Sequence, residues 1–215
     1  ESAWILHQEG PSLHGLSRIA AMARKPIPAV PYVPADLAEP ADLVGAIRAR
    51  RGGHLINLDR MLLNSVPYAR GWNAFLGEVR RNLSLSAKLR EIAMCGVAVL
   101  NGAEYEFFHH APELIAAGGT QEQVDALRMI DDIAADLSMF SPVERDAILL
   151  TIQMTRDIQV SEHLMKRLND ALGSTQVVEL VGTIAAYNMV SRFLIALGVE
   201  PEDHPPVPQT QRDAR

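Results

Sequence analysis

Residues 101–120, NGAEYEFFHHAPELIAAGGT, place several side chains that can carry protons in a stretch that continues into apolar residues. On a helix, Glu106 and His110 are four positions apart, so their side chains lie on the same face. His109 points about 100° away from His110, on the side of Tyr105. A carboxylate beside an imidazole fixes its tautomer and prepares the ring for proton transfer. The segment therefore indicates acid–base chemistry centred on His110.

A further carboxylate, Glu91, lies in the largely apolar segment that precedes this stretch. A carboxylate in an apolar helix is costly unless it is paired or hydrogen-bonded. If two antiparallel helices meet at Asn101-Gly102, Glu91 and His110 lie at similar distances from the turn. We therefore take Glu91, Glu106 and His110 as the candidate catalytic set. The structural alternative is a solvated Glu–His pair without chemistry, together with a buried glutamate that binds a backbone group.

The spacing Glu106-x-x-His109 also occurs in carboxylate-bridged di-iron bundles. Such centres need a second Glu-x-x-His and further glutamates on facing helices. Glu162-His163 does not have this spacing, and the chain contains no other copy of it. We therefore predict no metal site, and the acid–base set needs no organic cofactor.

The composition of the 215-residue chain is typical of one globular domain. Hydrophobic residues make up 48% and charged residues 21%, which excludes a disordered or fibrous chain. The net charge of −6, without any basic run, argues against a nucleic-acid surface. No uninterrupted apolar run reaches the ~18 residues of a membrane span. Cys95 is the only cysteine, so no disulfide framework is possible and the chain does not need an oxidising compartment. We therefore predict a cytoplasmic protein without a membrane partner.

The chain divides into four expected segments. Residues 1–21 are expected to be a leader or vector-derived segment, because Met22 opens a stretch that reads as a natural start. A genuine arm that packs on a partner subunit is the alternative for this segment. Residues 22–40 are rich in proline and favour an extended arm. Residues 41–200 form the expected helical domain, and residues 201–215 form a Pro-rich tail.

Hydrophobic periodicity is helical throughout the expected domain, and no stretch alternates like a strand. Capping boxes begin two helices, and Gly118-Gly119 ends the helix that carries the two histidines. The helices are expected at residues 41–50, 57–64, from 65 onward, 86–101, 104–117, 121–135, 142–156, 161–172 and 174–197. The sequence therefore predicts an all-α domain of about eight helices.

The segment LREIAMCGVAVLNGAEYEFFHHAPELIAAGGT resembles the core of the carboxymuconolactone decarboxylase family, which includes the alkyl hydroperoxidase D branch. The likeness extends upstream through LLNSVPYARGWNAFLGEVRRNLSLSAKLRE. Downstream it continues through FSPVERDAILLTIQMTRDIQVSEHLMKRL and VELVGTIAAYNMVSRFLIALGVE, so it covers most of residues 27–200. The resemblance implies an alkyl hydroperoxidase D-like helical fold and a homo-oligomer, usually a trimer or a hexamer.

The peroxidase branch of this family uses a glutamate, a CxxC pair and a histidine, and Glu91 and His110 match its relay residues. The two cysteine positions fall on Ala103 and Glu106. The resemblance therefore implies that this chain cannot run the dithiol–disulfide cycle. Cys95 lies one turn from Glu91, and a lone cysteine in an apolar helix is typically a small core residue rather than a peroxidatic thiol.

The decarboxylase branch has no cysteine pair and carries a YE…H pattern like that of Tyr105, Glu106 and His110. The resemblance implies a cofactor-independent lyase of aromatic compound catabolism that acts on a small carboxylated lactone or organic acid. In such an enzyme, His110 would be the proton donor, oriented by Glu106 or Glu91. An alkyl hydroperoxidase-like antioxidant protein and a non-catalytic helical oligomer that serves as a binding module are the alternatives.

Other residues are candidates for contact with the substrate. Tyr105 and His109 flank the catalytic set, and Tyr187, in AAYNMVSRFL, resembles one member of a recurrent family pair on the last helix. A pocket wall for His109 and a buried tyrosine with a satisfied hydroxyl for Tyr187 are the structural alternatives. A substrate carboxylate also needs a cation, for which Arg90 and Arg192 are candidates unless they are plain surface residues.

Overall fold

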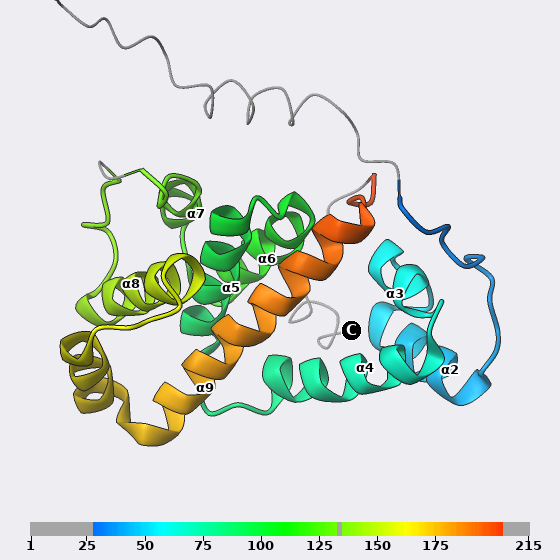
Figure 1. Ribbon diagram of the computed structural model, residues 1–215, viewed down its shortest axis with the longest axis horizontal. Helices are drawn as coiled ribbons and strands as arrows, with labels where there is room; N and C mark the ends of the chain where they lie inside the picture. The colour runs from blue at the N-terminus through cyan, green and yellow to red at the C-terminus, as the bar shows by residue number, and fades with distance from the viewer. Residues whose placement is uncertain (1–27, 133–134, 204–215) are drawn as a thin grey trace, which may run out of the picture.

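The computed structural model describes residues 28–132 and 135–203, and this part of the chain is helical without any strand. The helices are α2 (Ala41–Arg51), α3 (Asn57–Leu62), α4 (Val66–Arg81), α5 (Ala87–Asn101), α6 (Glu104–Ala116), α7 (Gln121–Arg128), α8 (Pro142–Arg156) and α9 (Glu162–Leu197). The all-α prediction with about eight helices is therefore confirmed (Figure 1). The expected leader, residues 1–21, and the tail from residue 204 onward lie outside the described residues.

Local sequence signals set most of the helix boundaries. Thr120 accepts a hydrogen bond from the backbone N–H of Gln123 at 3.2 Å, and Ser141 accepts one from Glu144 at 3.4 Å. In both capping boxes the side chain of the third helical residue, Gln123 or Glu144, accepts a hydrogen bond from the backbone N–H of the capping residue. This bond satisfies a further N–H group at the start of the helix. Gly173 has φ 75° and interrupts the helical conformation within α9. This break lies between the two helices that the sequence predicts, one ending at residue 172 and the next beginning at residue 174.

The prediction for the helix at 121–135 was wrong at its C-terminal end. α7 ends at Arg128, and the chain then turns through hydrogen bonds such as that from Asp132 N to the carbonyl of Met129 at 2.8 Å. Two consecutive acidic residues, Asp131 and Asp132, are unfavourable at the negative end of a helix dipole. The turn instead lets the Asp131 carboxylate accept a hydrogen bond from Arg156 of α8.

The core is built around α5, which packs against α6, α7, α8 and α9. One cluster of buried apolar residues joins α2, α3 and α4 to α5 and α9. A second cluster lies between α5 and the helices α6, α7 and α8. A side chain at Gly96 would lie 3.1 Å from the Thr151 methyl group, so this glycine permits the close approach of α5 and α8.

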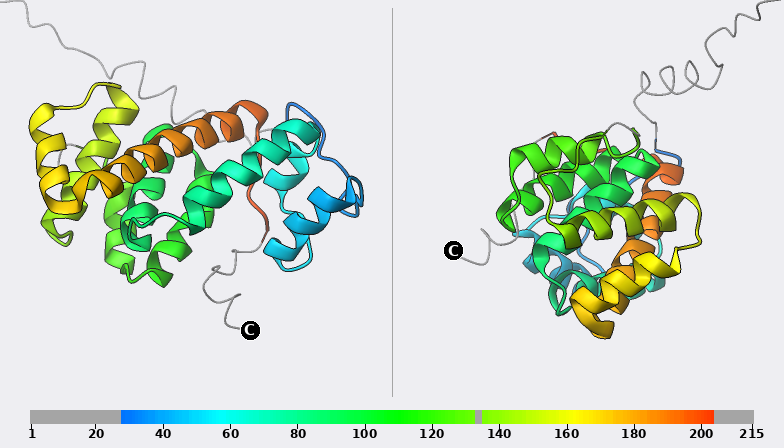
Figure 2. Two further views of the ribbon diagram at one scale, coloured as in Figure 1. Left: turned by 90° about the horizontal axis from the view of Figure 1, so that it is seen from below. Right: turned by 90° about the vertical axis from the view of Figure 1, so that its left-hand side faces the viewer.

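Helices α2 and α3 lie at one end of the molecule, α7 and α8 lie at the other, and α9 runs between the two ends (Figures 1 and 2). The described part of the predicted arm, residues 28–40, contains no helix. Asn64 Nδ2 donates to the carbonyl of Pro31 at 3.0 Å, and Arg48 Nη2 donates to that of Ala35 at 2.7 Å. These bonds fix the arm along the outside of α2 and α3.

By length and composition α9 would be able to cross a membrane, with a mean hydropathy of 1.5 in its most apolar window. Within that window, 44% of the helix is buried inside the protein. α9 contacts α4, α5 and α8, and its buried positions include Leu180, Ile184 and Leu194. These packing contacts explain why α9 is so apolar, since a helix packed in the core is apolar on most of its faces.

Candidate functional site

A cavity of about 220 Å³ lies among α2, α3, α4, α5, α6 and α9. Its lining includes the acid–base residues Glu91, Tyr105, Glu106, His109, His110 and Glu113. The lining also includes the arginines Arg50, Arg51, Arg80, Arg81 and Arg90. The cavity therefore combines groups that can transfer protons with groups that can bind anions.

The predicted approach of Glu91 to His110 is confirmed, because Glu91 Oε2 lies 2.7 Å from His110 Nδ1. Gly102, with φ 70°, makes the tight turn that folds α6 back against α5. A carboxylate can only accept a hydrogen bond, so Nδ1 carries the hydrogen. In the described part of the chain, Nε2 has no hydrogen-bond partner, and His110 lines the cavity. This ring is therefore fixed on one side and available for proton transfer on the other.

Glu106 does not orient His110, which corrects that part of the expectation. Its Oε2 accepts a short hydrogen bond from the Ser191 hydroxyl of α9, and no hydrogen bond joins it to His110. Oε1 is buried without a partner among the described residues. Burial raises the pKa of Glu106 well above its ordinary value, although Ser191 and Arg80 lower it. Burial therefore favours the neutral form of the Glu106 carboxyl group.

Glu202 is a site residue that the sequence did not reveal. Its Oε2 lies 2.7 Å from His109 Nε2, and its Oε1 accepts a hydrogen bond from the Tyr105 hydroxyl at 3.2 Å. Oε1 also accepts from the backbone N–H of Asn57 at the start of α3, at 2.8 Å. Glu202, in the described part of the predicted tail, thus holds two residues of the cavity lining in place. An acidic residue in a Pro-rich segment carries no local signal for such a role.

His109 and Tyr105 both line the cavity, as a role in substrate contact requires. Burial lowers the pKa of His109, although the bond to Glu202 raises it. The Tyr105 hydroxyl also accepts a hydrogen bond from the backbone N–H of Leu58 at 3.3 Å. The His109 ring and the Tyr105 hydroxyl are therefore both held by hydrogen bonds within the protein. His109 forms a wall of the cavity beside His110.

Tyr187 does not line the cavity, so the predicted substrate contact is replaced by a supporting position. Its ring is fully buried and packs edge to face on the His110 ring, with 4.9 Å between the centroids. Its hydroxyl accepts a hydrogen bond from Arg80 Nε at 2.9 Å. Burial raises the pKa of Tyr187 to about 12, so the hydroxyl stays protonated. Tyr187 therefore steadies His110 and Arg80 from behind.

The two arginine candidates of the sequence lie in different places. Arg90 lines the cavity, and its Nε lies 4.0 Å from Glu91 Oε1. Arg192 is exposed on α9 and donates to the Asn188 carbonyl at 2.9 Å, away from the cavity lining. The sequence also missed four lining arginines, namely Arg50, Arg51, Arg80 and Arg81. They occupy the last turns of α2 and α4, where arginine already stabilises the helix dipole, so their positions alone do not indicate a site.

Cys95 is fully buried in the apolar cluster between α5 and α8 and does not line the cavity. Burial and the nearby carboxylates Glu91 and Glu106 raise the pKa of the thiol well above its ordinary value. A protonated, enclosed thiol is a poor nucleophile. Cys95 is thus a core residue in this fold.

The Glu106-x-x-His109 pair does not converge on a shared point. Glu106 bonds to Ser191 of α9, whereas His109 bonds to Glu202 after α9. No group of three or more His, Cys, Asp or Glu side chains suited to a metal ion occurs in the part of the chain that the structure describes.

The all-helical arrangement with the α5–α6 hairpin is an alkyl hydroperoxidase D-like fold. An uncharacterized peroxidase-related protein from Silicibacter sp. TM1040 shares the fold with a TM-score of 0.71 and 16% identity, over 87% of this chain and 99% of that one. An alkylhydroperoxidase AhpD core protein from Ralstonia eutropha JMP134, also described as peroxidase-related, has a TM-score of 0.69 and 18% identity, over 83% and 94%. A debrominase in complex with 2,3,4-tribromopyrrole has a TM-score of 0.66 and 13% identity, over 87% and 99%.

Residues 67–153 match the model of the carboxymuconolactone decarboxylase family, the family that the sequence resembles. The matched region contains α5 and α6 with Glu91, Glu106 and His110. It contains neither α2, which carries the lining residues Arg50 and Arg51, nor α3. No curated protein matches the chain in sequence.

Proposed function

We propose that the protein is a cofactor-independent lyase that decarboxylates a small carboxylated lactone or organic acid. The observation that carries the proposal is the His110–Glu91 pair at 2.7 Å on the wall of an arginine-lined cavity. Decarboxylation needs a site that binds an anion, stabilises the charge left behind and delivers a proton to carbon. The cavity offers groups for all three tasks.

In the proposed reaction, the bond between the substrate carbon and its carboxylate breaks, and carbon dioxide leaves. The electron pair stays on the substrate as an enolate, whose oxygen the Arg90 guanidinium stabilises. Protonated His110 then gives the proton on Nε2 to the carbon, while Glu91 holds Nδ1 and stabilises the positive ring. Water returns a proton to His110 and closes the cycle. The raised pKa of Glu106 favours its neutral form, which adds no negative charge that would oppose the enolate.

A peroxidase is the alternative that the descriptions of the fold neighbours suggest. By the family resemblance, the positions of the thiol pair are Ala103 and Glu106, which carry no sulfur. Cys95 is enclosed and protonated. These features support the lyase over thiol-dependent peroxide reduction.

The deciding experiment is a screen of carboxylated lactones and keto acids for carbon dioxide release, followed by the His110→Gln variant. We expect kcat to fall by about 10²–10⁴-fold, because the variant lacks the proton donor. Thermal unfolding should be unchanged, since His110 is at the edge of the cavity and not in the apolar core. His163→Gln, at an exposed position on α9, is the matched control. Full activity in His110→Gln would exclude the proposed role.

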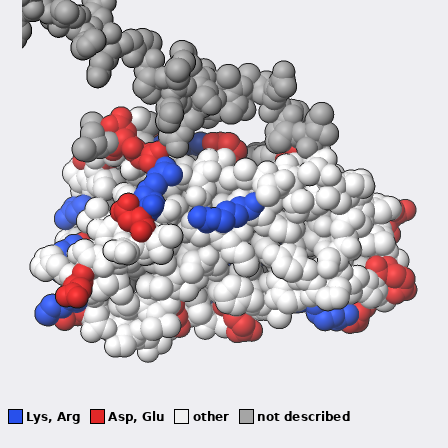
Figure 3. All heavy atoms as spheres, in the orientation of Figure 1, with Lys and Arg blue, Asp and Glu red and all other residues white. Residues whose placement is uncertain are grey.

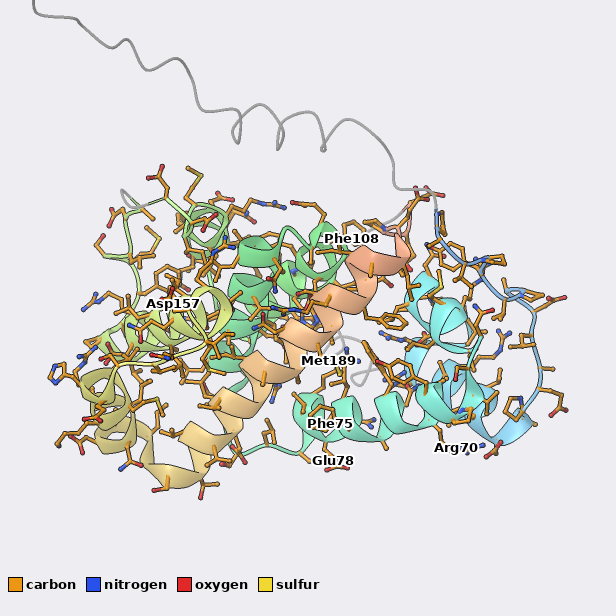
Figure 4. All side chains as sticks on the ribbon, viewed as in Figure 1. Arg70, Phe75, Glu78, Phe108, Asp157 and Met189 are labelled. Carbon is orange, nitrogen blue, oxygen red and sulfur yellow. The ribbon has the colours of Figure 1, made fainter. Side chains whose placement is uncertain are left out.

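The proposal includes a cytoplasmic homo-oligomer, a trimer or a hexamer as the family resemblance implies. The face of the protein in Figure 3 carries few charged side chains. Phe75 of α4 and Met189 of α9 lie on it, with 50% and 37% of their surface exposed (Figure 4). Such apolar side chains favour contact between copies of the chain. Light scattering on the purified protein measures the mass of the assembly.

A further inference from the structure

We propose that the cavity has a second activity, in which it moves the double bond of an unsaturated lactone or organic acid into conjugation with the carbonyl group. His109 is the base that takes a proton from one carbon, and His110 is the acid that gives a proton to another. Both rings line the same cavity and follow each other on α6. The inference goes beyond the proposed decarboxylation, because it gives His109 a chemical role and needs no carboxylate that leaves.

The two histidines are each held by a carboxylate from a different part of the chain. Glu91 of α5 lies 2.7 Å from Nδ1 of His110. Glu202, which follows α9, also lies 2.7 Å from Nε2 of His109. A carboxylate beside an imidazole fixes its tautomer and stabilises the ring when it is charged. One proton donor needs only the first of these pairs, so the second pair is available for another proton transfer.

Glu202 is fixed well enough to orient the His109 ring. Its Oε1 accepts hydrogen bonds from the backbone N–H of Asn57 at 2.8 Å and from the Tyr105 hydroxyl at 3.2 Å. Asn57 Nδ2 also donates to the carbonyl of Glu200 at 3.0 Å, which ties the same segment to α3. Burial raises the pKa of Glu202, but the hydrogen bonds from His109 and Asn57 lower it below its ordinary value. Glu202 is therefore a carboxylate that can only accept a hydrogen bond from His109.

The bond to Glu202 leaves Nδ1 as the free nitrogen of the His109 ring. Since the hydrogen lies on Nε2, the neutral ring has a lone pair on Nδ1. In the described part of the chain, Nδ1 has no hydrogen-bond partner. Burial lowers the pKa of His109 and outweighs the opposing bond to Glu202, and the charge of His110 lowers it further. The form of His109 that accepts a proton is therefore favoured while His110 carries one.

In the proposed reaction, Nδ1 of His109 takes a proton from the carbon beside the carbonyl group. That C–H bond breaks, and its electron pair forms an enolate that extends over the double bond. His110 then gives the proton on Nε2 to the far carbon of the double bond, and the double bond moves beside the carbonyl. Water carries a proton from His109 back to His110, so no further reactant is consumed. The decarboxylation also forms an enolate, so the Arg90 guanidinium of the cavity stabilises both.

A structural bond between the tail and α6 is the alternative role for the His109–Glu202 pair. Such a bond needs neither a free ring nitrogen nor a position on the cavity wall, and His109 has both. Asn57 would also hold Glu202 without any contribution from His109. A measurement of proton transfer, rather than of stability alone, separates the two roles.

α-Angelica lactone tests the second activity without any decarboxylation. Its double bond is not conjugated with the carbonyl group, and it has no carboxylate to lose. In heavy water, we expect the wild-type protein to convert it into the conjugated isomer faster than buffer does, with deuterium on the newly protonated carbon. Proton NMR measures both the rate and the deuterium content. Conversion no faster than in buffer would overturn the inference, and so would hydrogen carried over from the probe to that carbon, because one ring would then perform both steps.

His109→Ala removes the base and should slow the conversion by about 10²–10⁴-fold. Added imidazole should restore part of the rate, after subtraction of the rate with imidazole alone, because it can supply the missing base. A histidine with only a structural role would show no such rescue. His163→Ala, at an exposed position on α9, is the matched control and should behave as the wild type does. An unchanged rate in His109→Ala would disprove the role of His109, and so would a loss that imidazole does not restore.

Glu202→Gln is a second variant that tests the positioning of His109 and keeps a side chain of similar size. An amide can donate to Nε2 and hold the opposite tautomer, in which Nδ1 carries a hydrogen and cannot accept a proton. The kcat should fall by about tenfold to a hundredfold with KM nearly constant, and a thermal scan confirms that the variant is folded. Glu200→Gln is the matched control, since only backbone atoms of Glu200 bond to Asn57 and Tyr32. Equal rates in the two variants would show that Glu202 does not position His109.

The two activities of the cavity can fail separately. Conversion of α-angelica lactone through both histidines, without decarboxylation of any acid in the screen, would support the second activity and remove the lyase proposal. Decarboxylation through His110 without conversion of α-angelica lactone would have the opposite meaning. His110→Gln should lose both reactions, since His110 is the proton donor in each.

Discussion

The two sides of the cavity differ in what they contribute and in how they are built. α5 and α6 carry Glu91 and His110, which bond to each other across one tight turn. α2 and α4 carry four arginines that come together only when these helices pack. The first side holds the Glu91–His110 pair close together in sequence, and the second side brings positive charge from two helices that are far apart in sequence.

The two glutamates on the α5–α6 side also differ. Glu91 meets an imidazole at the cavity wall, whereas Glu106 meets only the Ser191 hydroxyl and is almost fully enclosed. Burial raises the pKa of Glu106 and therefore favours its neutral form. Both carboxylates line the cavity, but they have different partners because Glu91 faces His110 of α6 and Glu106 faces Ser191 of α9.

The largest expected effect comes from breaking the packing that joins the two sides. Leu76 of α4 is fully buried in the cluster shared by α2–α4, α5 and α9. Leu76→Ala should lower the free energy of unfolding by about 2–5 kcal/mol, because the cavity left behind cannot fully close. Urea denaturation followed by circular dichroism measures the loss, and a single transition is expected. Two separate transitions would show that the sides unfold independently. Glu78→Ala, exposed on α4, is the control (Figure 4).

A smaller effect should come from the acid–base side alone. Glu91→Gln should reduce kcat by about tenfold to a hundredfold, because an amide cannot stabilise the imidazolium and can hold the opposite tautomer. Steady-state kinetics on the substrate identified by the screen measures the change, with KM nearly constant. Glu104→Gln, exposed on α6, serves as the control. Equal loss in both variants would mean that Glu91 does not orient His110.

Glu106→Gln should change how stability depends on pH. Because folding raises the pKa of Glu106, its contribution to stability is complete below the ordinary glutamate pKa of about 4.3 and is lost as pH rises through the native pKa. Glutamine does not ionise, so the melting temperature of the variant relative to wild type should increase from pH 4 to pH 8. Thermal scans across this range test the sign. Parallel profiles for the two proteins would contradict a neutral Glu106.

The smallest expected effect is at Cys95, which lies on neither side of the cavity. Cys95→Ala should leave turnover unchanged, and the wild-type thiol should react with a thiol reagent only after unfolding, because it is fully buried. Peroxide consumption assays on both proteins complete the test. Thiol-dependent peroxide reduction that disappears in Cys95→Ala would favour a peroxidase over the proposed lyase.

The sequence by itself determined the features that depend on neighbours along the chain. Helical periodicity and the capping boxes at Thr120 and Ser141 located the helices, because these signals act within a few residues. The same local geometry predicted the Glu91–His110 pair, since helices that leave and return through one tight turn have their register fixed at Gly102. The local pattern failed at the end of α7, at Asp131 and Asp132, and at Glu106, which bonds to Ser191 rather than to His110.

The tertiary structure decided everything that joins distant parts of the chain. Ser191 beside Glu106, Glu202 beside His109, and the arginines of α2 and α4 come from helices and a tail far away in sequence. Where such side chains meet depends on how whole helix faces interdigitate in the core, which no short motif encodes. Local order therefore placed the Glu91–His110 pair, and long-range packing placed the charges around it.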